Sequence, residues 1–270
     1  MPIKFSCRES MMPGSSLAER FENAAKIGLA GIEIVGSSDF EHLEELKQAI
    51  KDTGVKASLV SSKNLFCLDA RSDRRAASIQ AMKDALTIAG EVGALGFILP
   101  PLIAIKLQDG QRIPDLSPFM GTAELERKLL AAILTDLADF AQEKGADVII
   151  EPLNRYEQWW PCSLQHGIDI CSDVGKPGVS MMADFFHMNI EDADFGESIR
   201  AAGKLVKNVH LADSQRLMPG YGHTDFRPGL AALRELAYDD YMAFECGVPG
   251  DPFIEFPKAM DYIRGEWDQA

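Results

Sequence analysis

Four apolar runs in the second half of this 270-residue chain carry a metal-binding side chain at or near their C-terminal end: Glu151, Asp184, His210 and Glu245. If a fold brings these ends together, three carboxylates and an imidazole repel one another unless a divalent cation neutralises them. Such a set suits Mn²⁺, our first expectation, or Mg²⁺ or Co²⁺, whereas Zn²⁺ usually recruits more nitrogen or sulfur. The sequence therefore predicts a divalent-metal site.

Three further polar residues stand three to six positions beyond these ligands, on the loops that would follow the same runs: Glu157, His187 and Arg216. An arginine can donate two parallel hydrogen bonds to a pair of oxygens, and a histidine can donate to a carbonyl oxygen. We expect these side chains to hold a substrate against the metal.

The elements that must position these residues repeat along the whole chain. An amphipathic stretch, a glycine and a short apolar run recur, with apolar runs starting near residues 3, 31, 56, 95, 147, 179, 206 and 241. Helical periodicity is clear over Asp73–Val92 and Ala123–Lys144. Glycine is the preferred residue just after a helix, and the glycines in question are Gly28, Gly54, Gly93, Gly145 and Gly175.

Eight such units predict an α/β fold, a single (β/α)8 TIM barrel over residues 1–270, whose active site lies at the C-terminal ends of the strands. The segment Pro100–Gly121 is rich in Pro, Gly and Asp and is predicted to be an insertion or lid after the fourth strand. An open doubly wound sheet is the alternative fold. No G-x-G-x-x-G follows the first strand, so we expect no nucleotide cofactor.

Composition excludes several classes of function. Lys and Arg number 27 against 41 Asp and Glu, a balance that disfavours nucleic acid and anionic membranes as partners. The longest apolar run, Val92–Ile105, is 14 residues and contains two prolines, too short to span a bilayer. Five scattered cysteines without a C-x-x-C pair indicate reduced thiols and a cytoplasmic location.

Several phrases resemble the sugar isomerase/epimerase superfamily of xylose isomerase-like TIM barrels. They are E-P-L-N-R-Y-E, A-D-F-F-H-M-N-I-E-D, H-L-A-D-S-Q-R, P-G-Y-G-H-T-D-F and F-E-C, together with the looser G-I-E-I at Gly31–Ile34. Within the superfamily they are similar to ketose 3-epimerases of the D-tagatose and D-psicose type and to 5-keto-L-gluconate epimerase. The sequence departs from the usual pattern at Phe185, where Thr is common, and at Gln215, where Asn is common. Both departures bear on substrate fit.

The resemblance implies that the quartet holds the metal and that Glu157, His187 and Arg216 contact a small-molecule sugar. It also implies a homodimer or homotetramer. Glu151 and Glu245 would then invert C3 of a ketose or keto-sugar acid through a metal-stabilised enediolate, one removing a proton and the other returning one to the opposite face.

Other functions remain open on the same site. An aldose–ketose or hydroxypyruvate-type isomerase, or an inosose dehydratase, would use the same ligands, and a non-catalytic metal-dependent sugar-binding module needs no turnover. An apurinic endonuclease on this barrel needs many histidines, and the chain has five. Arg8, Lys106 and Arg112 are basic residues near the first and fourth strand ends, where they could accept a substrate carboxylate or phosphate.

Overall fold

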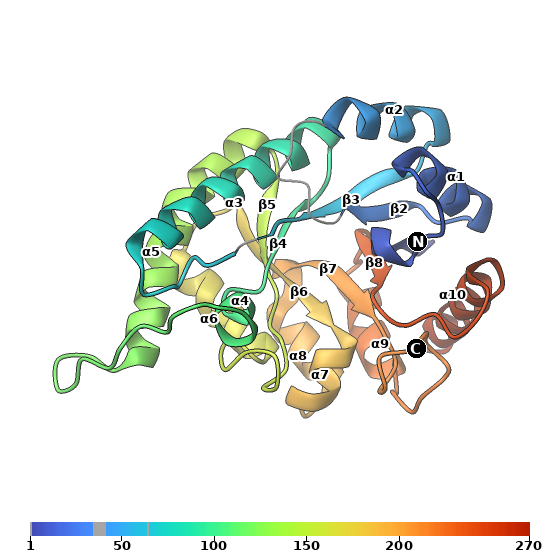
Figure 1. The fold of residues 1–270 in the computed structure, drawn as a ribbon. Helices are drawn as coiled ribbons and strands as arrows, with labels where there is room; N and C mark the ends of the chain where they lie inside the picture. The colour runs from blue at the N-terminus through green and yellow to red at the C-terminus, as the bar shows by residue number, and fades with distance from the viewer. Residues whose placement is uncertain (1, 35–41, 64) are drawn as a thin grey trace.

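Eight parallel strands form the centre of the molecule (Figure 1). The computed structural model describes residues 2–34, 42–63 and 65–270. The strands are β1 (Lys4–Cys7), β2 (Gly31–Ile34), β3 (Lys56–Ser61), β4 (Gly96–Leu99), β5 (Asp147–Ile150), β6 (Val179–Asp184), β7 (Val206–Leu211) and β8 (Tyr241–Phe244). Each strand pairs with its neighbour in sequence from β2 to β8, and β8 pairs with β1.

The seam between β1 and β2 closes the ring through few contacts. Arg8 and Glu33 form an isolated parallel bridge, and the Ala30 N–H donates to the Phe5 carbonyl oxygen at 2.7 Å. The sheet is therefore a (β/α)8 barrel, which confirms the predicted fold and excludes the open doubly wound sheet. The predicted strand starts agree with the observed ones to within one residue.

Helices wrap the outside of the barrel and alternate with the strands (Figure 1). They are α1 (Leu17–Ile27), α2 (Leu43–Thr53), α3 (Ser72–Val92), α4 (Ile103–Leu107), α5 (Thr122–Lys144), α6 (Leu164–Val174), α7 (Phe185–Glu191), α8 (Phe195–Ala202), α9 (Arg227–Glu235) and α10 (Pro252–Gln269). All five glycines predicted to follow helices have positive φ, between 63° and 91°. The left-handed conformation costs glycine little.

Two apolar clusters hold the layers together. The larger one fills the space between sheet and helices. A smaller one joins Leu59, Ile98, Ile149 and Met182 from four successive strands, and Ile98 also lines the cavity described below. These four side chains therefore fill the barrel interior, beneath the strand ends that carry the predicted ligands.

The segment Pro100–Gly121 follows β4 as predicted. It contains α4 and then extends away from the barrel at the lower left of Figure 1. Its middle is tied to the start of α3, because Arg74 forms a two-point ion pair with Asp109 and the Asp69 carboxylate accepts from the Gln111 N–H at 2.9 Å. No helix among the described residues is long and apolar enough to cross a membrane.

Candidate metal centre

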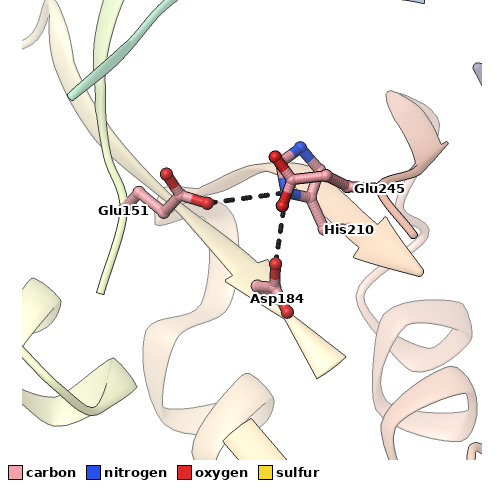
Figure 2. A group of neighbouring side chains, drawn as sticks. All are labelled: Glu151, Asp184, His210 and Glu245. Atoms are coloured by element: carbon pink, nitrogen blue, oxygen red, sulfur yellow. Dashed lines mark hydrogen bonds and ion pairs between the residues drawn. The ribbon is translucent and has the colours of Figure 1, made fainter. Parts of the chain in front are cut away.

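The four predicted ligands meet at the C-terminal end of the barrel (Figure 2). One ligand atom from each of Glu151, Asp184, His210 and Glu245 lies within 4.8 Å of all the others. His210 Nδ1 is 3.5 Å from Glu151 Oε1, 3.2 Å from Asp184 Oδ2 and 3.4 Å from Glu245 Oε2. Ligands at 2.0–2.3 Å from one cation are about 3–4.5 Å apart, so the side chains fit a divalent metal.

Each ligand is fixed by the element that carries it. Glu151 and Glu245 come directly after β5 and β8, and His210 lies within β7. Asp184 ends β6, and its two carboxylate oxygens have different partners. Oδ1 accepts from the Phe186 and His187 N–H groups at the start of α7, whereas Oδ2 lies 3.2 Å from His210 Nδ1. The helix cap orients the carboxylate toward the centre.

Burial of the cluster shifts the pKa values of its charged groups. Asp184 and His210 are buried, and only 19% of the Glu245 side chain is exposed. Burial raises the pKa of Glu151. At Glu245 burial acts in the same direction but is outweighed by His210, Arg8 and Arg216, so the pKa of that carboxyl falls well below its usual value. At His210 burial favours the neutral ring, yet Glu33 and Glu245 raise its pKa well above the usual value.

Glu33 lies in the candidate site, although the sequence pattern assigned it no role there. Its two carboxylate oxygens lie 3.1 and 3.0 Å from His210 Nε2, on the opposite side of the ring from the other ligands. Asn208 donates to it at 2.9 Å, and its side chain is buried. A carboxylate behind a metal-binding histidine fixes the orientation of the ring. A charged residue inside the otherwise apolar β2 was the available signal.

Arg216 links two of the predicted residues. It donates to Glu157 Oε1 at 2.9 Å and to Glu245 Oε2 at 2.8 Å, and its guanidinium lies 4.8 Å from the centre of the Phe186 ring. Arg216 has a φ of 57°, which an arginine rarely adopts and which is often found at functional sites.

The turn around Arg216 is organised by Asp213. This buried carboxylate accepts from the N–H groups of Ser214, Gly220 and Thr224 at 2.7, 2.9 and 3.0 Å. The Arg216 carbonyl oxygen in turn accepts from the Gly247 N–H at 2.8 Å. The unusual backbone of Arg216 is therefore supported from both sides.

His187 differs from the other predicted substrate contacts because it is buried rather than cavity-lining. Its Nδ1 accepts from the Asn154 N–H at 3.2 Å, and the Asn154 side-chain amide lies 2.8 Å away. The other ring nitrogen, Nε2, has no hydrogen-bond partner among the described residues and lies 3.7 Å from Asp184 Oδ2. An unpartnered buried nitrogen beside the ligands leaves a donor for a ligand oxygen.

A cavity of about 410 Å³ opens above the ligands. Glu151, Glu157, Arg216 and Glu245 line one part of it. The rest of the lining comes from Arg8 after β1, from the end of β3 and residues after it, from β4 and the segment that follows it, and from a residue after β5. Besides Arg8, these residues are Ser61, Ser62, Lys63, Leu65, Ile98, Pro100, Ile103, Ala104, Gln108 and Leu153. The segment after β4 therefore contributes part of the cavity lining through Pro100, Ile103, Ala104 and Gln108.

The two departures from the usual motif have clear structural contexts. Phe185 is fully buried and packs against Phe226 and Phe195, with ring centres 5.5 and 5.2 Å apart. Gln215 donates to the Tyr221 carbonyl oxygen at 2.6 Å within the turn that carries Arg216. Neither residue displaces a ligand.

Comparison with known proteins identifies a matching family and several similar relatives. A family model described as xylose isomerase-like TIM barrel matches residues 21–265. The chain is 27% identical over 254 residues to 3-dehydro-D-guloside 4-epimerase of Escherichia coli strain K12, covering 92% of this chain and 94% of that protein. It is 38% identical over 122 residues to a D-psicose 3-epimerase of Agrobacterium fabrum strain C58, covering 45% of this chain and 40% of that relative.

Solved structures agree on the fold. The apo form of 3-keto-D-glucoside 4-epimerase from E. coli superposes with a TM-score of 0.84 at 25% identity and covers 97% of this chain and 99% of its own. D-psicose 3-epimerase from Clostridium cellulolyticum H10 superposes with a TM-score of 0.83 at 21% identity, covering 98% and 99%. The second likeness concerns the fold alone.

Proposed function

The chain belongs to the xylose isomerase-like TIM barrel family, and from this premise we propose that it is a divalent-metal-dependent epimerase of a ketose or keto-sugar acid. The observation that carries the proposal is the convergence of Glu151, Asp184, His210 and Glu245 beneath a cavity lined by two of the carboxylates. Relatives that align with the chain are sugar epimerases by name. The enzyme class is accordingly isomerase.

The quartet would hold the metal, and Mn²⁺ is the cation that we propose for three carboxylate oxygens and one imidazole nitrogen. When bound, the cation supplies positive charge beside the carbonyl and hydroxyl oxygens of the substrate, which makes the adjacent C–H more acidic. Glu33 would keep His210 oriented for this role.

The two glutamates perform the proton transfers in this proposal. Glu151 and Glu245 come from strands separated by β6 and β7 and both line the cavity. One carboxylate removes the proton from C3, and the other delivers a proton to the opposite face, which inverts the stereocentre. Two carboxylates with different surroundings suit these two tasks.

Three neighbouring residues orient the substrate. Arg216, held by Glu157 and Glu245, presents its remaining N–H groups to substrate oxygens, and His187 Nε2 donates toward the carbonyl oxygen as negative charge develops there. Glu157 accepts from a substrate hydroxyl. Each of these roles requires the side chain to touch substrate in the complex.

We test the proposal by proton NMR of the Mn²⁺-loaded protein in D₂O with a panel of ketoses and keto-sugar acids. The expected result is deuterium at C3 together with the C3 epimer, lost in Glu151→Gln and in Glu245→Gln. Glu126→Gln is the matched control, because Glu126 is a buried glutamate that pairs with Arg112 away from the cavity.

Two outcomes would contradict the proposal. Label at C1 or C2 with an aldose product would identify an aldose–ketose isomerase. Binding of sugar without exchange of any α proton would identify a binding module.

The same proposal extends to the state of the chain in the cell. We propose one domain over residues 1–270, a cytoplasmic location and a homodimer or homotetramer. The cysteines support a reducing compartment, because all five are free thiols and four of them are buried. Sedimentation velocity measures the subunit number directly.

A further inference from the structure

The basic residues near the cavity differ in how many of their side-chain N–H groups already donate to protein acceptors. Arg216 is committed to Glu157 and Glu245. Lys106 donates to the Arg155 carbonyl oxygen at 2.6 Å, and Arg112 forms an ion pair with Glu126 and stacks on Trp159 at 4.3 Å. Neither Lys106 nor Arg112 lines the cavity, so neither is placed to bind a ligand there.

Arg8 is in a different situation. It follows β1 directly, its backbone N–H is fixed by the Phe244 carbonyl oxygen at 3.0 Å, and its side chain lines the cavity with 20% exposed. Two carboxylates lie nearby, Glu245 at 3.4 Å and Glu33 at 3.7 Å. Both contacts are longer than a charged hydrogen bond. Within the described ranges, the Arg8 guanidinium makes no hydrogen bond, although it has five N–H donors.

Lys63 adds a second positive charge to the lining of the cavity. It follows β3, is exposed and lines the cavity, and no ion pair of its ammonium is present among residues 2–34, 42–63 and 65–270. The lining also includes the apolar side chains of Ile98, Ile103 and Leu153. An apolar wall strengthens a charge pair by keeping water away.

Resting on the proposed function, we propose that the substrate is an anionic ketose whose carboxylate or phosphate is bound by Arg8 and Lys63. The planar guanidinium matches a carboxylate in two-point geometry, and the ammonium adds a point charge at the rim. The reacting carbons then lie over the Glu151 and Glu245 carboxylates, and the anionic group lies in the part of the cavity formed by β1 and β3. Arg8 and Lys63 thereby determine specificity.

The test compares three ligands of identical stereochemistry: a ketohexose, its 6-carboxylate and its 6-phosphate. Calorimetry of the Mn²⁺-loaded protein measures their binding, and exchange in D₂O separately measures turnover. We expect one of the two anions to bind at least about 10-fold more tightly than the neutral sugar. Arg8→Gln should weaken binding of that anion roughly 10- to 100-fold, and Lys63→Met roughly 2- to 5-fold.

Lys51→Met is the matched control, because Lys51 is an exposed lysine of α2 that does not line the cavity. It should keep the preference for the anion. The comparison of the two anions identifies which group the subsite accepts.

The inference is overturned if all three ligands bind equally, or if Arg8→Gln weakens the neutral and anionic sugars by the same factor. The second result would mean that Arg8 only neutralises Glu33 and Glu245. Failure of the proposed function looks different, since an anion preference in calorimetry without any exchange in D₂O would remove the epimerase and keep the subsite.

Discussion

Replacing Glu33 tests whether a residue that does not reach the metal controls how tightly the metal binds. Glu33→Gln keeps the size of the side chain and an oxygen that can accept from His210 Nε2, but it removes the negative charge that lies 3.0 Å from that nitrogen. The imidazole then becomes a weaker ligand and is less firmly oriented.

The expected magnitude follows from the contacts of Glu33. Loss of an outer carboxylate partner of a metal-binding histidine weakens metal binding by about 10- to 100-fold, which corresponds to about 1.4–2.7 kcal/mol. We expect Glu33→Gln near the lower value because the amide oxygen still accepts a hydrogen bond. Glu33→Ala should lie near the upper value, since it also leaves Asn208 without its acceptor.

Electron paramagnetic resonance of free Mn²⁺ during titration of the metal-free protein measures this affinity without any substrate. Glu126→Gln is again the control, as a buried glutamate outside the metal centre, and should bind Mn²⁺ as the unmodified protein does. Unchanged Mn²⁺ affinity in both Glu33 variants would refute the assigned role of Glu33.

Three further changes address the structure around the site. Asp213→Asn replaces one of the oxygens that accept the Ser214, Gly220 and Thr224 N–H groups. Chemical denaturation should show that the free energy of unfolding falls by about 1–3 kcal/mol, and calorimetry should show weaker sugar binding. If neither value changes, the Asp213 hydrogen bonds are not needed to position Arg216. Hydrogen bonding from Arg71 holds the pKa of Asp69 well below its usual value, so the ionised Asp69 stabilises the fold fully above about pH 4 and loses this effect as the pH falls below that. In urea denaturation, the difference in unfolding free energy between Asp69→Asn and the unmodified protein should therefore narrow below about pH 4. A difference that stays constant with pH would contradict this. An added Cβ at Gly229 would lie 2.6 Å from Phe185 Cζ, so Gly229→Ala should cost about 1–3 kcal/mol of stability, and an unchanged denaturation midpoint would show that Phe185 moves freely.

Most of the architecture was predictable because its signals are local. In each of the five predicted helix-to-strand units, a glycine with positive φ follows the helix, and an apolar run marks each of the eight strands. The quartet was predictable for a related reason: parallel strands bring their C-terminal ends to one edge, so spacing along the chain becomes proximity.

The remaining features depend on contacts between distant segments. Glu33 reaches His210 across 177 positions of sequence, and nothing near residue 33 signals this pairing beyond a charge within an apolar strand. His187 matched a motif, yet its burial against Asn154 depends on the path of the loop after β5. Lys106 and Arg112 looked as available as Arg8 because hydrogen bonds to Arg155 and Glu126 leave no pattern in the sequence.

The narrow seam between β1 and β2 has a consequence for how the protein is made. Arg8 and Glu33 both form the bridge at that seam and face the centre built by later strands. During synthesis, these two residues emerge from the ribosome before any of the four ligands, but β1 can pair fully with β8 only after residue 244 has emerged. Glu245, the last ligand, arrives at the same moment. A nascent chain therefore cannot assemble all four ligands before Glu245 has emerged, so the complete metal centre forms only after β1 and β8 can pair.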